Sequence, residues 1–206
     1  MPDDEQPAET RPPVVLETRE ACESIVVIRL DRPAERNPLS VATLEAVDQL
    51  VSALSARTDI SAIIFTGTGD AFASGADIRE LSLLTPDTAN EFARRGQRLM
   101  QRIADAPQLT IAAVNGYCMG GGLDLALACD LRCAASSAVF AHPGARLGII
   151  TGWGGTQRLP RLIGQARALE MFATARRVGA DEAYEIGLVH RVGEPVVECA
   201  LALARA

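Results

Sequence analysis

Two segments of the sequence place small residues between an apolar run and the expected start of a helix. The first leads from Ile64–Gly67 to Phe72–Ile78, and the second leads from Ala113–Gly116 to Gly120–Asp124. Small residues let a ligand approach the backbone, and a helix start offers unpaired N–H groups with partial positive charge. Two such turns side by side would direct two N–H groups at one oxygen atom, as an oxyanion hole requires. The glycines also suit tight helix–strand packing, so this pattern alone leaves both interpretations open.

Strands and helices alternate around these turns. Apolar, β-branched runs predict strands at 25–30, 61–66, 109–114, 131–135, 138–142 and 188–192. Apolar residues at helical spacing predict helices at 41–56, 86–105, 123–129, 155–163, 165–174, 180–186 and 194–206. The alternation predicts an α/β fold in which parallel strands are covered on both faces.

The composition excludes several classes of protein. The chain has 206 residues, which suits one domain, and all 20 of its basic residues are Arg. Without Lys there is no Schiff-base enzyme, no pyridoxal-phosphate enzyme and no lysine-bearing phosphate loop. The net charge of −6 argues against partners such as nucleic acid or a membrane surface. Ser74 lies outside any G-x-S-x-G motif, so a serine hydrolase is not expected either.

The five cysteines are expected to be buried free thiols rather than disulfides. Cys129 and Cys133 have a C-x3-C spacing, but no second pair follows, so no metal site is predicted. Residues 1–13 are acidic and Pro-rich, which predicts a disordered tail. They lack the pattern of a signal peptide, and no apolar run is long enough to span a membrane, so a cytoplasmic location is expected.

Two stretches, Ala71–Ile78 and Ile111–Asp130, resemble the enoyl-CoA hydratase/isomerase (crotonase) family. The second stretch is the more specific, and the runs 148–159 and 183–189 fit the same family in the right order. The resemblance implies a crotonase-type spiral of short β-strands and α-helices (a ββα superhelix). It places a core domain at 14–193 and the start of a shortened, truncated C-terminal helical part at 194–206.

The resemblance also implies what the chain binds. Members of this family bind acyl-CoA thioesters, so coenzyme A would be part of the substrate and no permanently bound cofactor is expected. The backbone N–H groups of Ala76 and Gly121 would stabilise an enolate on the thioester oxygen. The residues implied to contact the substrate are Ser74, Asp77, Ile78, Gly120 and Trp153.

Some of these residues also have ordinary structural interpretations. Asp77 suits a helix cap, and this is the preferred interpretation of its side chain. Trp153 is either a wall of the acyl pocket or a core residue. Arg32 and Arg36 either meet the phosphates of coenzyme A or are ordinary solvated side chains.

The sequence departs from the family at its acids. Typical hydratases of this family carry two acidic residues that position water and move protons, the first of them usually a glutamate. Asp124 stands at the first position, one methylene shorter, and Gly144 stands at the second. Asp124 is therefore the candidate acid/base, although an acid in a first helical turn also suits the helix N-terminus. His142, two residues before Gly144, is either a substitute for the missing acid or a structural hydrogen-bond donor.

The sequence thus predicts an acyl-CoA-processing lyase or isomerase, of the kind found in fatty acid metabolism, without efficient hydratase activity. The alternative is a pseudo-enzyme that binds CoA thioesters. The family resemblance implies a homotrimer, or a hexamer formed as a dimer of trimers. The apolar run 196–206 is expected to leave an exposed hydrophobic face unless another subunit covers it.

Overall fold

The computed structural model describes residues 12–18 and 23–206. Residues 1–11 of the expected tail, and Cys22, lie outside this range. The strands are β1 (Val14–Thr18), β2 (Ile25–Leu30), β3 (Pro38–Leu39), β4 (Ala62–Gly67), β5 (Ala71–Ala73), β6 (Gly75–Ala76), β7 (Leu109–Val114), β8 (Tyr117–Met119), β9 (Leu131–Ala134), β10 (Val139–Ala141), β11 (Val178–Gly179) and β12 (Arg191–Val192).

Apart from α2, which was not predicted, the helices lie close to the predicted positions. They are α1 (Val41–Ser55), α2 (Ile78–Ser82), α3 (Pro86–Ala104), α4 (Gly121–Ala128), α5 (Gly155–Ile163), α6 (Gln165–Thr174), α7 (Ala180–Glu185) and α8 (Val196–Ala204), with short 3-10 turns η1 (Pro33–Glu35) and η2 (Pro143–Leu147). Ser40 shows why α1 begins where it does, because its hydroxyl accepts the N–H of Thr43 at 3.2 Å. No helix in the described part of the chain is long and apolar enough to cross a membrane.

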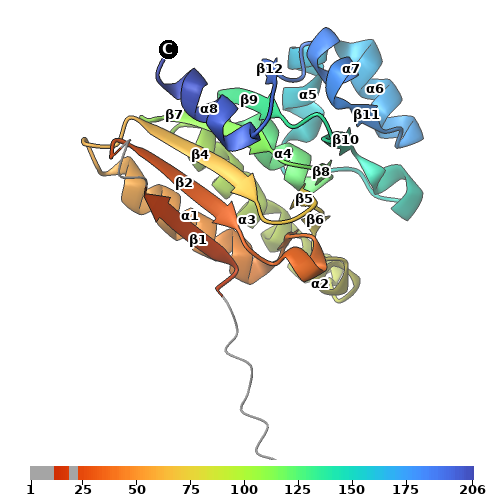
Figure 1. Cartoon of the computed structure of the whole chain (residues 1–206). Coiled ribbons are helices and arrows are strands. Elements are labelled where there is room, and N and C mark those ends of the chain that lie inside the picture. Colours follow the sequence, from red (N-terminus) through yellow and green to blue (C-terminus); the bar gives the residue numbers. More distant parts are fainter. Residues whose placement is uncertain (1–11, 19–22) are drawn as a thin grey trace, which may run out of the picture.

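The larger sheet has the strand order β1-β2-β4-β7-β9-β12 (Figure 1). Within this sheet the neighbouring strands β2, β4, β7, β9 and β12 are parallel, as predicted. Strand β1 pairs with β2 in the antiparallel direction. A smaller sheet has the order β11-β10-β8-β5, and there β11 is antiparallel to β10. The purely parallel prediction is therefore wrong at these two edges, where short strands lay outside the predicted set.

Helices cover both faces of the larger sheet. Alternate residues of each strand face opposite sides, so Val26 and Ile28 of β2 pack in one apolar cluster, while Ile25 and Val27 pack in another. The first cluster includes α1 and α3, and the second includes α8 (Figure 1). Because α8 buries Val196, Ala200 and Leu201 on the sheet, the expectation that this run presents an uncovered apolar face is wrong.

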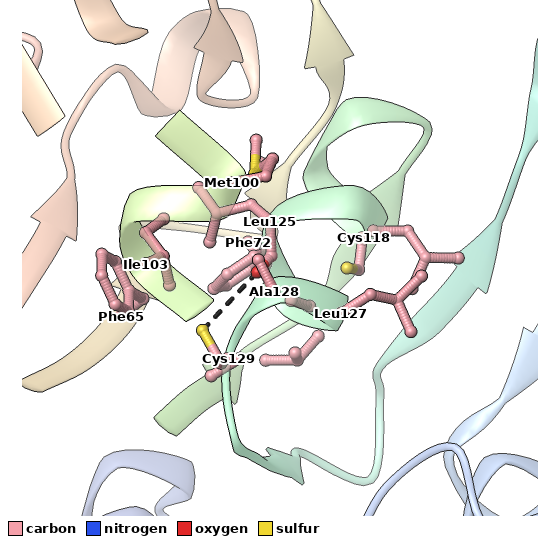
Figure 2. Close-up of a cluster of buried hydrophobic side chains, with 14 of the residues drawn as sticks. Phe65, Phe72, Met100, Ile103, Cys118, Leu125, Leu127, Ala128 and Cys129 are labelled. Carbon is pink, nitrogen blue, oxygen red and sulfur yellow. Dashed lines mark hydrogen bonds between the residues drawn. The ribbon is translucent and has the colours of Figure 1, made fainter. Parts of the chain in front are cut away.

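Helix α4 is buried on every side. Leu125, Leu127 and Ala128 lie in the same apolar cluster as Phe65, Phe72, Met100 and Ile103 (Figure 2). Cys129, just after the helix, donates its thiol to the carbonyl of Leu125 at 3.5 Å (Figure 2). Cys118, Cys129 and Cys133 are buried free thiols, as predicted. The tight packing holds α4 in a fixed position, and this helix carries Gly121 and Asp124.

Candidate active site

The two glycine-rich turns lie side by side, the arrangement that an oxyanion hole would require. Strand β5 of the first turn pairs in parallel with β8 of the second. Asn115 joins them, because its Oδ1 accepts the N–H of Gly67 at 3.0 Å and its Nδ2 donates to the carbonyl of Ala71 at 3.2 Å. Asn37, which sequence reasoning did not single out, donates to the same carbonyl at 2.7 Å. Asn115 therefore ties the two turns together, while the buried amide of Asn37 holds the first turn in place.

The backbone at Ala76 adjoins the backbone at Gly121. A Cβ atom added to Gly121 would lie only 3.4 Å from the N atom of Ala76. Gly120 has a φ of +50°, a conformation that side chains rarely adopt, and it allows the sharp turn into α4. The local sequence indicates the turn, but it does not show the pairing, which joins segments far apart in the chain.

One cavity of about 280 Å³ gathers the predicted site residues. Those that line it are Ser74, Ala76, Ile78, Gly120, Gly121, Asp124 and Trp153. Asp124 is the only carboxylate among the described residues that line it. The walls are otherwise largely apolar, and the apolar side chains Ile78, Leu147, Ile149 and Ile150 are 65%, 54%, 49% and 67% exposed. This composition suits a ligand with an apolar chain and one polar reacting group.

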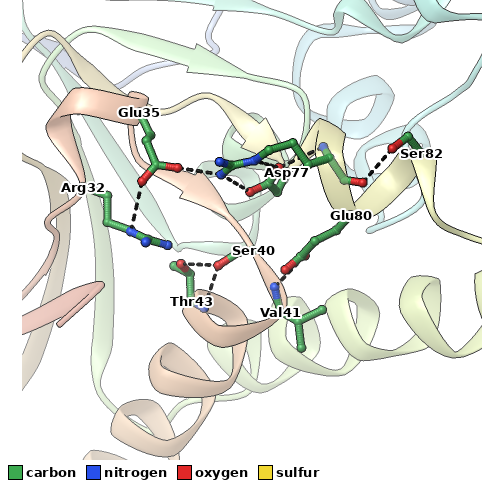
Figure 3. Close-up of polar contacts among 9 residues, drawn as sticks. Arg32, Glu35, Ser40, Val41, Thr43, Asp77, Glu80 and Ser82 are labelled. Atoms are coloured by element: carbon green, nitrogen blue, oxygen red, sulfur yellow. Dashed lines mark hydrogen bonds and ion pairs between the residues drawn. The ribbon is translucent and has the colours of Figure 1, made fainter. Parts of the chain in front are cut away.

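Asp77 is absent from the cavity lining and caps α2 instead. Its carboxylate accepts the backbone N–H of Arg79 at 2.9 Å, and the Arg79 guanidinium contacts it at 2.7 Å (Figure 3). This contact with Arg79 lowers the pKa of Asp77. The helix-cap interpretation is confirmed. Arg79 also contacts Glu35 at 2.6 Å, and Glu80 accepts the N–H of Val41 at 2.8 Å, so α2 is tied to the turn η1 and to α1 (Figure 3).

Both arginines that were considered for phosphate contacts have an acidic partner within the protein. Arg32 lies 3.5 Å from Glu35, and Arg36 lies 3.5 Å from Asp70. The Arg36 guanidinium also lies 5.2 Å from the ring centroid of Tyr117. These contacts fit the ordinary interpretation of both side chains at a protein surface.

Asp124 lines the cavity and is fully buried. One carboxylate oxygen, Oδ2, accepts the hydroxyl of Thr151, while Oδ1 makes no well-formed hydrogen bond. Burial raises the pKa of Asp124 to about 6, and the Thr151 hydroxyl, nearby backbone N–H groups and the charge of Arg158 oppose that rise. The carboxyl group can therefore gain or lose a proton near neutral pH, as a catalytic acid/base requires.

His142 and Thr151 approach Asp124 from other parts of the chain. His142 follows β10, and its Nε2 lies 3.6 Å from Oδ1 of Asp124. Thr151 stands in the loop between η2 and α5, and nothing in the local sequence marked it as a partner of Asp124. Sequence reasoning gave His142 a structural interpretation and a catalytic one. The structure places it in the lining of the cavity, beside Asp124.

Trp153 is both a pocket wall and a core residue. It lines the cavity, it is 4% exposed, and its ring centroid lies 5.6 Å from that of Phe92. The ring lies against two glycines, because a Cβ atom on Gly96 or on Gly121 would approach it to 2.2 Å or 2.4 Å. The two interpretations of Trp153 are therefore not exclusive.

Gly144 lines the cavity where relatives are expected to carry the second acid. A Cβ atom at this position would lie 2.6 Å from the carbonyl oxygen of Ile149. Because that oxygen belongs to the backbone, any side chain at 144 requires the loop around Ile149 to move. A Gly144→Glu substitution would therefore not simply restore an acid.

Replacing Asp124 with Asn is expected to stabilise the fold at about pH 7 by about 2–3 kcal/mol, because folding raises the pKa of this acid. An acid whose pKa is raised by folding favours the folded state at low pH, and this contribution is lost as the pH rises through about 6. The gain of the variant over the wild type should therefore shrink toward zero as the pH falls to about 4. Urea denaturation of both proteins between about pH 4 and about pH 7 measures this difference in the free energy of unfolding.

The exposed acid Asp87 provides the matched control for this experiment. Asp87→Asn should give no comparable gain at any pH, since its side chain is not buried. An Asp124→Asn variant that is less stable than the wild type at about pH 7 would contradict the raised pKa.

Comparisons with known proteins identify the family of the chain. The sequence model of the family described as "Enoyl-CoA hydratase/isomerase" matches residues 20–205. The chain is 46% identical over 174 residues to "Putative enoyl-CoA hydratase/isomerase YngF" of Bacillus subtilis, covering 84% of this chain and 67% of that protein. It is 42% identical over 174 residues to "Crotonyl-CoA hydratase" of Syntrophomonas wolfei, with the same coverage of 84% and 67%.

The solved structures give the same family. The crystal structure of an enoyl-CoA hydratase from Bacillus anthracis matches with a TM-score of 0.89 and 38% identity, covering 94% of this chain and 75% of that one. The predicted crotonase fold is thus confirmed. The chain spans about two thirds of the length of the curated relatives that it matches. From its fold and its sequence, the chain belongs to the enoyl-CoA hydratase/isomerase family.

Proposed function

We propose that the cavity binds an acyl-CoA thioester and that Asp124 moves a proton at the carbon next to the thioester carbonyl. The observation that carries this proposal is the buried carboxylate of Asp124, with one oxygen held by Thr151 and the other without a well-formed hydrogen bond. It lies in a largely apolar cavity beside the adjoining backbones of Ala76 and Gly121. A carboxylate so placed is suited to proton transfer with a carbon acid.

The enolate formed by this proton transfer carries its negative charge on the thioester oxygen. The N–H groups of Ala76 and Gly121 are the proposed donors to that oxygen, and such fixed donors typically contribute about 3–4 kcal/mol each. Gly121 is also the first residue of α4, so the positive end of the helix dipole adds to the stabilisation. Ser74, Ile78, Gly120 and Trp153 would line the path of the substrate, whose coenzyme A part enters and leaves with it.

Asp124 alone supports a shift of the double bond. Its ionised carboxylate takes the proton from C2 of a 3-enoyl thioester, and the electrons of the C–H bond form the dienolate. The same group then returns the proton to C4, which leaves the conjugated 2-enoyl thioester and restores the carboxylate. One acid/base and one oxyanion site suffice for this isomerisation.

The test is to incubate the protein with short and medium 3-enoyl-CoA thioesters and follow the conjugated 2-enoyl product by its absorbance. Calorimetry with acetyl-CoA measures binding separately. The proposal predicts both binding and turnover. Binding without turnover of any thioester would contradict it.

A binding protein without catalysis is the second candidate function. It is favoured by Gly144, which has no side chain where a second acid is expected, and by the single carboxylate among the described residues of the cavity. This candidate predicts that acyl-CoA binds without turnover, both in the wild type and in any variant of Asp124.

The cytoplasmic location and the homotrimer or hexamer stay predictions of the sequence. Light scattering of the purified chain measures its oligomeric state.

A further inference from the structure

His142 is a buried polar side chain that no group of the described protein satisfies. It is 3% exposed, and neither ring nitrogen has a hydrogen-bond partner. A neutral imidazole has one donor and one acceptor nitrogen, and leaving both unpaired in the interior is costly. Phe172 packs beside the ring, with centroids 4.9 Å apart, and His142 is one of the residues that line the cavity. A polar molecule in the cavity would satisfy it.

The unpaired atoms of His142 and Asp124 meet at the same place. Nε2 of His142 lies 3.6 Å from Oδ1 of Asp124, and neither atom has a well-formed hydrogen bond. Thr151 holds the other oxygen of Asp124, so the carboxylate cannot turn freely away. Two other titratable groups interact electrostatically with Asp124. The charge of Arg158 on α5 lowers the pKa of Asp124, and the charge of Asp124 raises the pKa of Cys118 on β8.

We propose that His142 is the second proton-transfer group of the cavity and that it activates a water molecule for addition to C3 of a 2-enoyl thioester. It would act in place of the acid missing at Gly144, in partnership with Asp124. This inference rests on the proposed function, because it uses the same thioester site and the same enolate.

The proposed addition is balanced without any reactant other than water. The water oxygen bonds to C3 as its proton passes to the acceptor nitrogen of His142, and the C2–C3 double-bond electrons move to form the enolate. The imidazolium then passes a proton to the adjacent carboxylate of Asp124, which delivers it to C2 as the carbonyl re-forms. The product is a 3-hydroxyacyl thioester, and both side chains return to their starting states.

The acid–base properties of the pair suit these roles. Burial lowers the pKa of His142 to about 4, so the ring is neutral at neutral pH and able to accept a proton. Burial raises the pKa of Asp124 to about 6, so its carboxylate can take the proton from the imidazolium, whose pKa is lower. Because the two groups are close, they titrate as a pair rather than independently.

The experiment compares two reactions of the same protein. His142→Gln keeps a polar side chain of similar size but has no group that gains a proton. It should lower the hydration of 2-enoyl-CoA about 100-fold more than it lowers the isomerisation of 3-enoyl-CoA. His190→Gln is the matched control, since His190 is the other histidine, is exposed, and its ring accepts the N–H of Arg132 outside the cavity. It should leave both rates unchanged.

Chemical rescue separates catalysis from structure. His142→Ala leaves space for a free imidazole, and added imidazole should restore hydration about 10-fold or more without changing isomerisation. Equal loss of both reactions in His142→Gln, with no rescue of His142→Ala, would mean that His142 only supports the fold and would overturn the inference. Isomerisation without hydration in the wild type would also overturn it, yet leave the proposed function standing. Absence of both reactions would contradict the proposed function itself.

Discussion

Asp124→Asn is expected to slow the isomerisation of 3-enoyl-CoA by about 10³-fold while acyl-CoA binding stays within about threefold of the wild type. The amide keeps the size of the side chain and cannot accept the proton from C2. The buried carboxylate is the only one among the described residues of the cavity, so no neighbouring acid is in place to take over. Steady-state rates together with calorimetry separate the loss of chemistry from any loss of binding.

Asp124→Glu is the matched variant for this prediction. It retains a carboxylate and has the acid that the family usually carries, so it should be more active than Asp124→Asn. In the wild type, the rate should rise as the pH increases through about 6, because the base acts in its ionised form. Full activity of Asp124→Asn would show that another group takes the proton.

Gly121→Ala is expected to lower kcat/KM about 100-fold, because the donor at this position and the pocket wall would both be displaced. The new Cβ atom would lie 2.4 Å from Cζ3 of Trp153, so the ring or the start of α4 must move. Trp153 is the only tryptophan of the chain, and its fluorescence reports that movement directly. Activity and fluorescence are therefore expected to change together.

A second substitution tests whether the clash with Trp153 is the cause. Gly121→Ala combined with Trp153→Ala should recover about tenfold over Gly121→Ala alone, since substitutions in contact are not additive. Gly179→Ala is the control, because a Cβ atom there meets nothing within 4 Å and its φ of −79° suits alanine. Wild-type activity and unchanged fluorescence in Gly121→Ala would show that the ring is not confined as described.

The local sequence predicted most of the larger elements, because their physical causes are local. The 3.6-residue spacing of Leu44, Val47, Val51 and Leu54 marks one buried face, and α1 ends within a residue of its predicted boundary. The short strands β3, β5, β6 and β8 were not predicted. Two or three residues carry too little periodicity, and these strands exist only because partner segments lie beside them.

For the last helix, α8, the sequence predicted the element and not the face of the sheet on which it packs. The sequence correctly predicted that residues near 196–204 are helical and apolar. It did not show where they would pack, because alternate residues of the strands face the two sides of the sheet and either side presents apolar groups. The structure places α8 on the side formed by Ile25, Val27 and Ile64.

For the site, the sequence by itself determined which residues are candidates: two glycine-rich turns that lead into helices, one acid on the following helix, and no acid at Gly144. Family-specific motifs carry that information, because a turn or a helix start depends on a few adjacent residues. Only the tertiary structure decided which groups meet. Asp77 caps α2 and does not line the cavity. Thr151 and His142, from different parts of the chain, lie beside Asp124. Packing of distant segments sets those distances and buries the carboxyl group, and that burial brings its pKa into the range needed for proton transfer.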